Sequence, residues 1–172
     1  MKILTLCTGN VARSVMLAYM LSDLAESNGL DWRVRSAGTH VTEGVAMSAR
    51  TRDALLSIPE LGEHRYGQHR SHQLTAEDCE WSDLILAAEY EHVAFVRRHF
   101  WGVACAQLGQ FATHAPLGQG LDVQLASLRE LAPDESLDVK DPAGGTQADY
   151  DECARQLWRY ALAFTDLVSG AG

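Results

Sequence analysis

Long apolar runs are absent from this sequence. The apolar stretch at its start, Met1–Cys7, is too short for a signal peptide, and no other stretch approaches the length of a membrane span. Cysteines are few: there are four, and no two lie close enough for a Cys-x-x-Cys pair or for zinc-ligand spacing. We therefore expect a cytoplasmic protein with reduced thiols, no metal site and no cofactor.

Positive charge is scarce as well. The chain has 14 lysines and arginines against 23 acidic residues, which gives a net charge of −9. This balance disfavours non-specific binding to nucleic acid or to anionic membranes, so an anionic ligand has to be held by a local site. The 172 residues suffice for one domain with a hydrophobic core, so we expect residues 1–172 to form a single domain, acting as a monomer or weak dimer.

Strand-like and helix-like segments alternate along the chain. We expect strands at Lys2–Leu6, Trp32–Ala37, Leu84–Ala88 and Val103–Leu108, and helices at Arg13–Ser27, Val45–Leu56, Glu91–Phe100, Leu121–Leu131 and Thr146–Val168. Residues 59–73 and 132–145 are expected to be loops. This order predicts an α/β fold, a parallel sheet flanked by helices. Ligands of such folds bind at the carboxyl ends of the strands, where loops 7–14, 38–46 and 132–145 meet.

The turn between the first strand and the first helix carries the strongest chemical signal. Its residues are Cys7, Thr8, Gly9, Asn10, Val11, Ala12, Arg13 and Ser14. A loop that wraps into a helix N-terminus aims several backbone N–H groups at one point, which suits a phosphate. Gly9 and Asn10 tolerate the left-handed backbone that such a loop needs. Arg13 can fork two donors onto a phosphate, and the same positive field favours a thiolate at Cys7.

We therefore predict that Thr8–Ser14 bind phosphate and that Cys7 is the nucleophile. The alternative explanation is a buried cysteine at a strand end that is followed by an exposed arginine. Three features favour the catalytic interpretation: the permissive Gly9-Asn10 pair, Ser14 as a hydrogen-bond partner of the thiolate, and the strand–loop–helix setting.

The motif Cys-x5-Arg-Ser at the first strand–helix turn resembles that of the low-molecular-weight protein tyrosine phosphatases. The resemblance runs in the family's order from residue 2 to about 168 and includes Ser36-Ala37-Gly38-Thr39, His69-x-Ser71-x-Gln73-Leu74-Thr75, Asp83-Leu84-Ile85-Leu86 and Asp141-Pro142. It implies a four-stranded parallel sheet and a metal-free mechanism with phosphocysteine at Cys7. The implied substrate is a phosphorylated protein or a small aryl phosphate.

Ester cleavage also needs a group that protonates the leaving oxygen and then activates water. Asp141 is the predicted general acid and base, because Asp141-Pro142 matches the family's position and Pro142 restrains the backbone beside it. Four nearby acidic residues compete without motif support: Asp134, Asp138, Asp149 and Asp151.

The sequence departs from the family at four places. Ala12 stands where most members have a second loop cysteine, Val15 replaces a proline, and His72 replaces a basic residue. Ala143-Gly144-Gly145 stands where aromatic residues often line the cleft. These changes predict weaker binding of an aromatic substrate, unless the Tyr150 side chain turns back and forms an aromatic wall of the cleft.

Several other residues have modest expected roles. Asn10 is expected to hold the loop's shape, with Ser36 and Thr39 as further candidates for ordering it. His69 lies in a polar segment and is expected to be mostly solvated. Five residues are expected to pack in the protein: Cys79, Cys105, Cys153, Trp158 and Tyr160.

Two other functions compete. An arsenate reductase that uses an external thiol needs only Cys7, whereas the thioredoxin-linked kind needs cysteines near the third strand, where none stands. A non-catalytic phosphate-binding module would have lost the nucleophile, the arginine or the acid, and all three are present.

Overall fold

Four short apolar segments pair in parallel to form the sheet at the centre of the computed structural model, which describes residues 1–62 and 66–170. The strands are β1 (Lys2–Cys7), β2 (Arg33–Gly38), β3 (Leu84–Ala87) and β4 (Cys105–Gln107), in the order β2-β1-β3-β4. β1 alternates between the two faces: Ile3 and Cys7 join one hydrophobic cluster, and Leu4 and Leu6 join the other. The strand is therefore buried on both faces, as a central strand of a parallel sheet should be.

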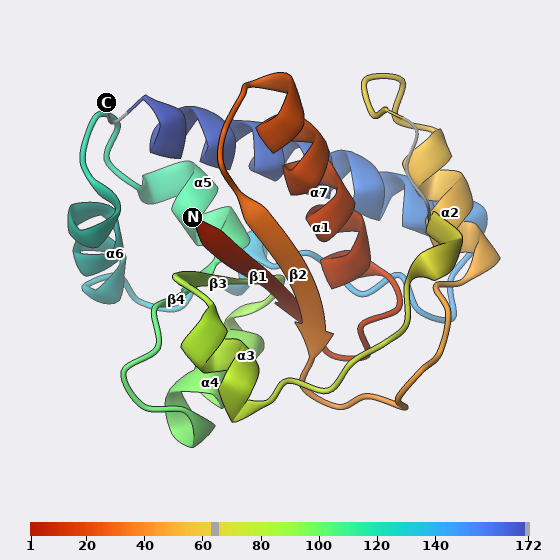
Figure 1. The fold of residues 1–172 in the computed structure, drawn as a ribbon, viewed down its shortest axis with the longest axis horizontal. Coiled ribbons are helices and arrows are strands. Elements are labelled where there is room, and N and C mark those ends of the chain that lie inside the picture. Colours follow the sequence, from red (N-terminus) through yellow and green to blue (C-terminus); the bar gives the residue numbers. More distant parts are fainter. Residues whose placement is uncertain (63–65, 171–172) are drawn as a thin grey trace.

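Helices cover both faces of the sheet (Figure 1). Their bounds are α1 Arg13–Ser27, α2 Ala49–Leu56, α3 Ala76–Trp81, α4 Tyr90–His99, α5 Leu108–His114, α6 Leu121–Arg129 and α7 Gln147–Ser169. Buried side chains of α1, α5 and α7 share a core with Ile3 and Leu86, whereas those of α3 and α4 pack on the opposite face. Short 3-10 turns lie at Tyr66–Gln68 and Glu135–Leu137.

The predicted fold class is confirmed: this is a single α/β domain with a four-stranded parallel sheet. α2 starts at Ala49 rather than Val45, because the Ser48 hydroxyl accepts from the Thr51 amide and caps the helix there. The expected strand over Val103–Leu108 is limited to β4, and Leu108 already begins α5. The expected loop over 59–73 contains the Tyr66–Gln68 turn, and its residues 63–65 lie outside the described residues.

The carboxyl ends of the strands meet at one edge of the sheet. Cys7 pairs with Gly38, and the Thr39 amide donates to the Cys7 carbonyl at 2.9 Å. A Cβ at Gly38 would collide with the Thr8 carbonyl, so glycine lets β2 pass close to the loop that follows β1. The Val139 amide donates to Ala88 O at 2.9 Å, which brings the late loop to the same rim as predicted. Among the described helices, none is both long and apolar enough to cross a membrane.

Candidate active site

The Cys7 thiol lies at the bottom of the loop between β1 and α1, and Cys7 is 3% exposed. Its sulfur is 3.0 Å from Ser14 Oγ, and the Asn10 amide donates to it at 3.3 Å. The Asn10 side-chain amide donates to Ser14 Oγ at 2.9 Å, which leaves the Ser14 hydroxyl hydrogen available to the sulfur. Donors that converge on a sulfur favour its anionic, nucleophilic form.

Asn10 fixes the shape of this loop, as predicted. Its φ of 51° lies in the left-handed region, where the local hydrogen bonds of Asn make the strain tolerable. The His72 amide donates to Asn10 Oδ1 and the His69 ring donates from Nε2 to Asn10 O, both at 2.8 Å. The expectation that His69 is mostly solvated is wrong: its ring is half-buried and this burial lowers its pKa.

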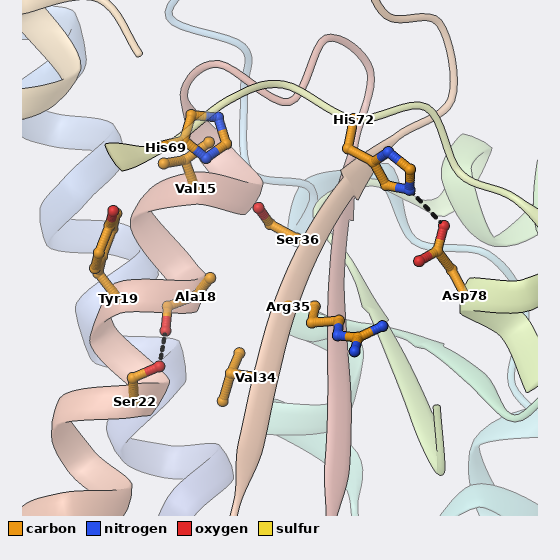
Figure 2. Close-up of a pocket in the computed structure, with 10 residues that line it drawn as sticks. All are labelled: Val15, Ala18, Tyr19, Ser22, Val34, Arg35, Ser36, His69, His72 and Asp78. Carbon is orange, nitrogen blue, oxygen red and sulfur yellow. Dashed lines mark hydrogen bonds and ion pairs between the residues drawn. The ribbon is translucent and has the colours of Figure 1, made fainter. Parts of the chain in front are cut away.

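Behind the loop, a groove of about 420 Å³ lies between α1, β2 and the segment that carries His69, His72 and Asp78. Figure 2 shows the two histidines at one end of this groove and the His72–Asp78 pair, whose Nε2–Oδ2 distance is 2.8 Å. None of Cys7, Arg13 and Asp141 lines it. His72 therefore supports the loop through its backbone and pairs its ring with Asp78.

Arg13 begins α1 and is 1% exposed. One guanidinium nitrogen lies 2.8 Å from Glu89 Oε1 and donates to Val139 O at 3.0 Å. The other lies 2.6 Å from Asp141 Oδ2. Burial alone lowers the pKa of Arg13, but the surrounding negative charges of Cys7, Asp141 and Glu89 raise it overall. A permanent positive charge thus lies beside the thiol.

Asp141 is brought to Arg13 from 128 residues away in the sequence. Its Oδ1 accepts from the Ala143 amide at 3.0 Å, and its side chain is 42% exposed, so the carboxyl group borders both Arg13 and solvent. The competing acids are occupied elsewhere: Asp134 and Asp149 accept from Ser136 and Thr146, and Asp138 accepts from Tyr90 and Gln107. Asp151 accepts from Gln147. The geometry therefore favours Asp141.

Two further residues of the site were missed from the sequence. Glu89 follows the end of β3 and pairs with Arg13, and a carboxylate directly after a buried parallel strand was the available signal. His92, in the first turn of α4, contacts Thr8 Oγ1 through Nε2 at 2.9 Å. Burial, reinforced by the charge of Arg13, lowers the pKa of His92 to about 4.

The sequence left open whether Tyr150 forms an aromatic wall of the cleft, and in the structure it does not. Tyr150 is 7% exposed and packs in the core with Cys153 and Leu157, so it does not line the cleft. A cavity of about 560 Å³ beside Asp141 is bordered by residues 140–145 together with Asp149, Glu152 and Cys153. The packing roles of the other residues are confirmed for Cys79, Cys105, Cys153, Trp158 and Tyr160.

The loop between β1 and α1 holds a buried thiol among hydrogen-bond donors, and the Arg13 guanidinium and the Asp141 carboxyl group lie beside it. This arrangement suits thiol-based phosphoryl transfer. Comparison with known proteins gives the same class. The sequence profile of the low molecular weight phosphotyrosine protein phosphatase family matches residues 2–168. The chain therefore belongs to this family, and it is a cysteine-dependent phosphatase.

Similar proteins include both tyrosine and arginine phosphatases. A protein-arginine-phosphatase of Bacillus subtilis is 29% identical over 91% of this chain and 94% of its own length. The low molecular weight protein-tyrosine phosphatase A of Mycobacterium tuberculosis is 29% identical over 85% of this chain and 78% of its own length. The crystal structure of a low molecular weight protein tyrosine phosphatase from T. tengcongensis has a TM-score of 0.75 at 24% identity and covers 95% of this chain and 96% of that one. Family membership supports the phosphatase over the arsenate reductase and the non-catalytic module.

Proposed function

We propose that this protein hydrolyses phosphotyrosine in proteins through a phosphocysteine at Cys7. The observation that carries the proposal is the meeting of the Cys7 thiol, the Arg13 fork and the Asp141 carboxyl at one edge of the sheet. In the first step, the thiolate attacks phosphorus, an S–P bond forms and the P–O bond to the phenol breaks. Asp141 gives its proton to the phenolate oxygen.

The second step releases phosphate. The Asp141 carboxylate takes a proton from water as the water oxygen attacks phosphorus and the S–P bond breaks, which restores the Cys7 thiolate. Arg13 binds the equatorial oxygens in both steps, where a planar fork matches two oxygens at once. Because Asp141 Oδ2 contacts Arg13 in this structure, the incoming phosphate takes that place and the carboxyl group turns to the leaving oxygen.

The rest of the loop supplies the phosphate cradle. The proposed binding residues are Thr8, Gly9, Asn10, Val11, Ala12, Arg13 and Ser14. Within the described chain, the amides of Gly9, Val11 and Ala12 have no protein acceptor, while the Asn10 amide donates to the Cys7 sulfur. Backbone donors at the start of α1 are also favoured partners of an anion because of the helix dipole.

Phosphoarginine in proteins is the second candidate substrate. The B. subtilis relative is a protein-arginine-phosphatase, and the cavity beside Asp141 is bordered by small residues and by the carboxylates of Asp149 and Glu152. Carboxylates attract a cationic guanidinium, whereas an aromatic ring gains no stacking partner from Ala143 and the following glycines.

A matched set of peptides tests the proposal. Three peptides of one sequence carry phosphotyrosine, phosphoarginine or phosphoserine, and phosphate release is measured for the wild type, Cys7→Ser and, as a matched control, Cys79→Ser. We expect release from phosphotyrosine that Cys7→Ser abolishes and Cys79→Ser preserves. Preference for phosphoarginine would establish the second candidate, and release by Cys7→Ser at the wild-type rate would refute both.

The cellular setting is also a proposal. We propose that residues 1–172 form one catalytic domain that works in the cytoplasm, without metal or cofactor, as a monomer or weak dimer. The net charge of −9 argues against nucleic acid as a partner. Small aryl phosphates fit the same loop and serve as alternative substrates.

A further inference from the structure

His92 contacts the phosphate loop from a different element of the fold. It lies in the first turn of α4, 84 residues from Thr8, and is 4% exposed. The Glu89 amide donates to His92 Nδ1 at 3.1 Å. A nitrogen that accepts from a backbone N–H carries no hydrogen, so the ring is neutral and its hydrogen is on Nε2.

The ring's tautomer determines what Thr8 can do. His92 Nε2 lies 2.9 Å from Thr8 Oγ1 and donates to it, and Arg13 donates to the same oxygen at 3.3 Å. A hydroxyl oxygen has two lone pairs and one hydrogen. With both lone pairs occupied, Thr8 is left as a donor, and its hydrogen has no acceptor among the described residues.

The position of Thr8 indicates which acceptor it serves. Thr8 directly follows Cys7, and its hydroxyl contacts the same Arg13 nitrogen that lies 2.6 Å from Asp141 Oδ2. A phosphoryl group bound by that nitrogen brings an anionic oxygen to the Thr8 hydroxyl. Hydrogen bonds to ionised acceptors are the stronger kind, and a pre-oriented donor has its largest effect on the transition state.

We propose that His92 is a positioning residue, whose Nε2–H orients the Thr8 hydroxyl to donate to the phosphoryl group under attack by Cys7. The inference rests on the proposed phosphatase function and adds a donor and its support to it. The charged and titratable groups that face His92 are Arg13, Glu89, Asp141 and His40. Burial, reinforced by Arg13 and His40 and opposed by Asp141, lowers the pKa of His92, so the neutral donor persists at neutral pH.

Two substitutions separate the ring's two hydrogen bonds. In His92→Asn, the shorter side chain keeps an acceptor for the Glu89 amide and loses the donor to Thr8. In His92→Gln, the side-chain amide nitrogen reaches the position of Nε2 and keeps that donor. Thr8→Val removes the hydroxyl at nearly the same shape, and Thr8→Ser keeps it. His99→Asn, on the exposed last turn of α4, is the matched control.

The experiment measures kcat and KM for these variants and for the double variant His92→Asn, Thr8→Val. We expect Thr8→Val to lower kcat roughly 100-fold with KM little changed, as for a lost transition-state donor. His92→Asn should cost on the order of 10-fold when Thr8 is present and less than about twofold in the Thr8→Val background. His92→Gln and Thr8→Ser should recover most of the kcat that His92→Asn and Thr8→Val lose, and His99→Asn should stay near the wild type.

The leaving group gives an independent readout. Thr8 acts on the phosphoryl oxygens, so the loss should be equal for activated and unactivated aryl phosphates, whereas a disturbance of Asp141 would grow as the leaving group becomes more basic. A loss from His92→Asn that persists in the Thr8→Val background, or that depends on the leaving group, would overturn the inference. Unchanged kcat in His92→Asn would overturn it as well.

A measurement on the unmodified protein covers the case in which the His92 variants do not fold. Nitrogen NMR of the ring reports which nitrogen carries the hydrogen, and we expect Nε2–H from pH 5 to pH 8. An Nδ1–H or charged ring at pH 7 would contradict the inference. Phosphate transfer to Cys7 in the wild type is measured in parallel, so that failure of the proposed function is recognised separately.

Discussion

Replacing Arg13 by lysine removes the planar guanidinium and keeps its positive charge. The guanidinium uses one nitrogen for Glu89 and Val139 and the other for Asp141 and Thr8, over distances of 2.6 to 3.3 Å. A single ammonium cannot serve both pairs, and it cannot hold two phosphoryl oxygens in a plane. Loss of one such transition-state donor lowers kcat roughly 100-fold, which corresponds to about 2.7 kcal/mol.

The same substitution also affects stability. Arg13 is 1% exposed, so a hydrogen-bond acceptor that lysine does not reach is left unpaired and shielded from water. Each such acceptor lowers the free energy of unfolding by about 1–3 kcal/mol. The assays are kcat with a phosphotyrosine peptide and urea denaturation, with Arg98→Lys on the exposed side of α4 as control. A kcat loss of less than about threefold for Arg13→Lys, with the protein folded, would show that the fork does not hold the transferring group.

Three further outcomes are expected. Asp141→Asn should slow phosphoryl transfer to Cys7 from a phosphotyrosine peptide about 10²- to 10⁴-fold in single-turnover experiments and change this first step little for a highly activated aryl phosphate, because only the poor leaving group needs a proton; equal losses of the first step for both would contradict the role. The pKa of His92 is about 4 in the fold, below its ordinary 6.5, so the unfolded chain takes up the proton first. The free energy of unfolding should therefore fall by about 1 kcal/mol per pH unit as the pH drops from 6.5 to 4, a dependence that His92→Asn removes in urea titrations; an unchanged slope would refute this. Hydroperoxide should inactivate the enzyme with incomplete recovery in dithiothreitol, because Ala12 offers no thiol and burial raises the pKa of the neighbouring Cys153 to about 12, which leaves little thiolate to trap a Cys7 sulfenic acid. Ala12→Cys should restore recovery, whereas full recovery with a mass-mapped Cys7–Cys153 disulfide would disprove the prediction.

The parts of the site that are local in sequence could be predicted from it. A dozen residues contain the apolar run of β1, the permissive Gly9 and Asn10, and Arg13 at the start of α1. Their chemistry is set by backbone geometry that a strand–loop–helix turn imposes wherever it occurs. The late position of Asp141 was predicted by its Asp-Pro motif, since the loop between α6 and α7 returns to the strand ends.

Contacts between distant segments could not be predicted from local sequence patterns. Glu89 and His92 reach Arg13 and Thr8 across more than 70 residues, and only the pairing of β1 with β3 brings them there. His69 is half-buried because its segment crosses the phosphate loop, which polar composition alone does not reveal.

Whether Tyr150 lines the cleft was left open, although the sequence held the signal. It lies on the stripe of α7 that continues through Cys153, Ala154 and Leu157, the helical spacing of a buried face. The Thr146 capping box fixes where α7 begins and so turns Tyr150 toward the core. Proximity in sequence to Asp141 was the weaker guide, because the direction of a helical side chain turns by about 100° with each residue.

Covalent transfer of phosphate to Cys7 is the central claim, and rapid-quench mass spectrometry tests it most directly. The enzyme is mixed with a phosphotyrosine peptide, stopped in acid during turnover and digested, and the peptide that contains Cys7 is examined for one added phosphoryl group. The mechanism predicts that this modified peptide accumulates early in the wild type, decays as phosphate is released, and persists in Asp141→Asn when an activated aryl phosphate forms it. Steady phosphate release with no phosphate on Cys7 at any time would contradict it.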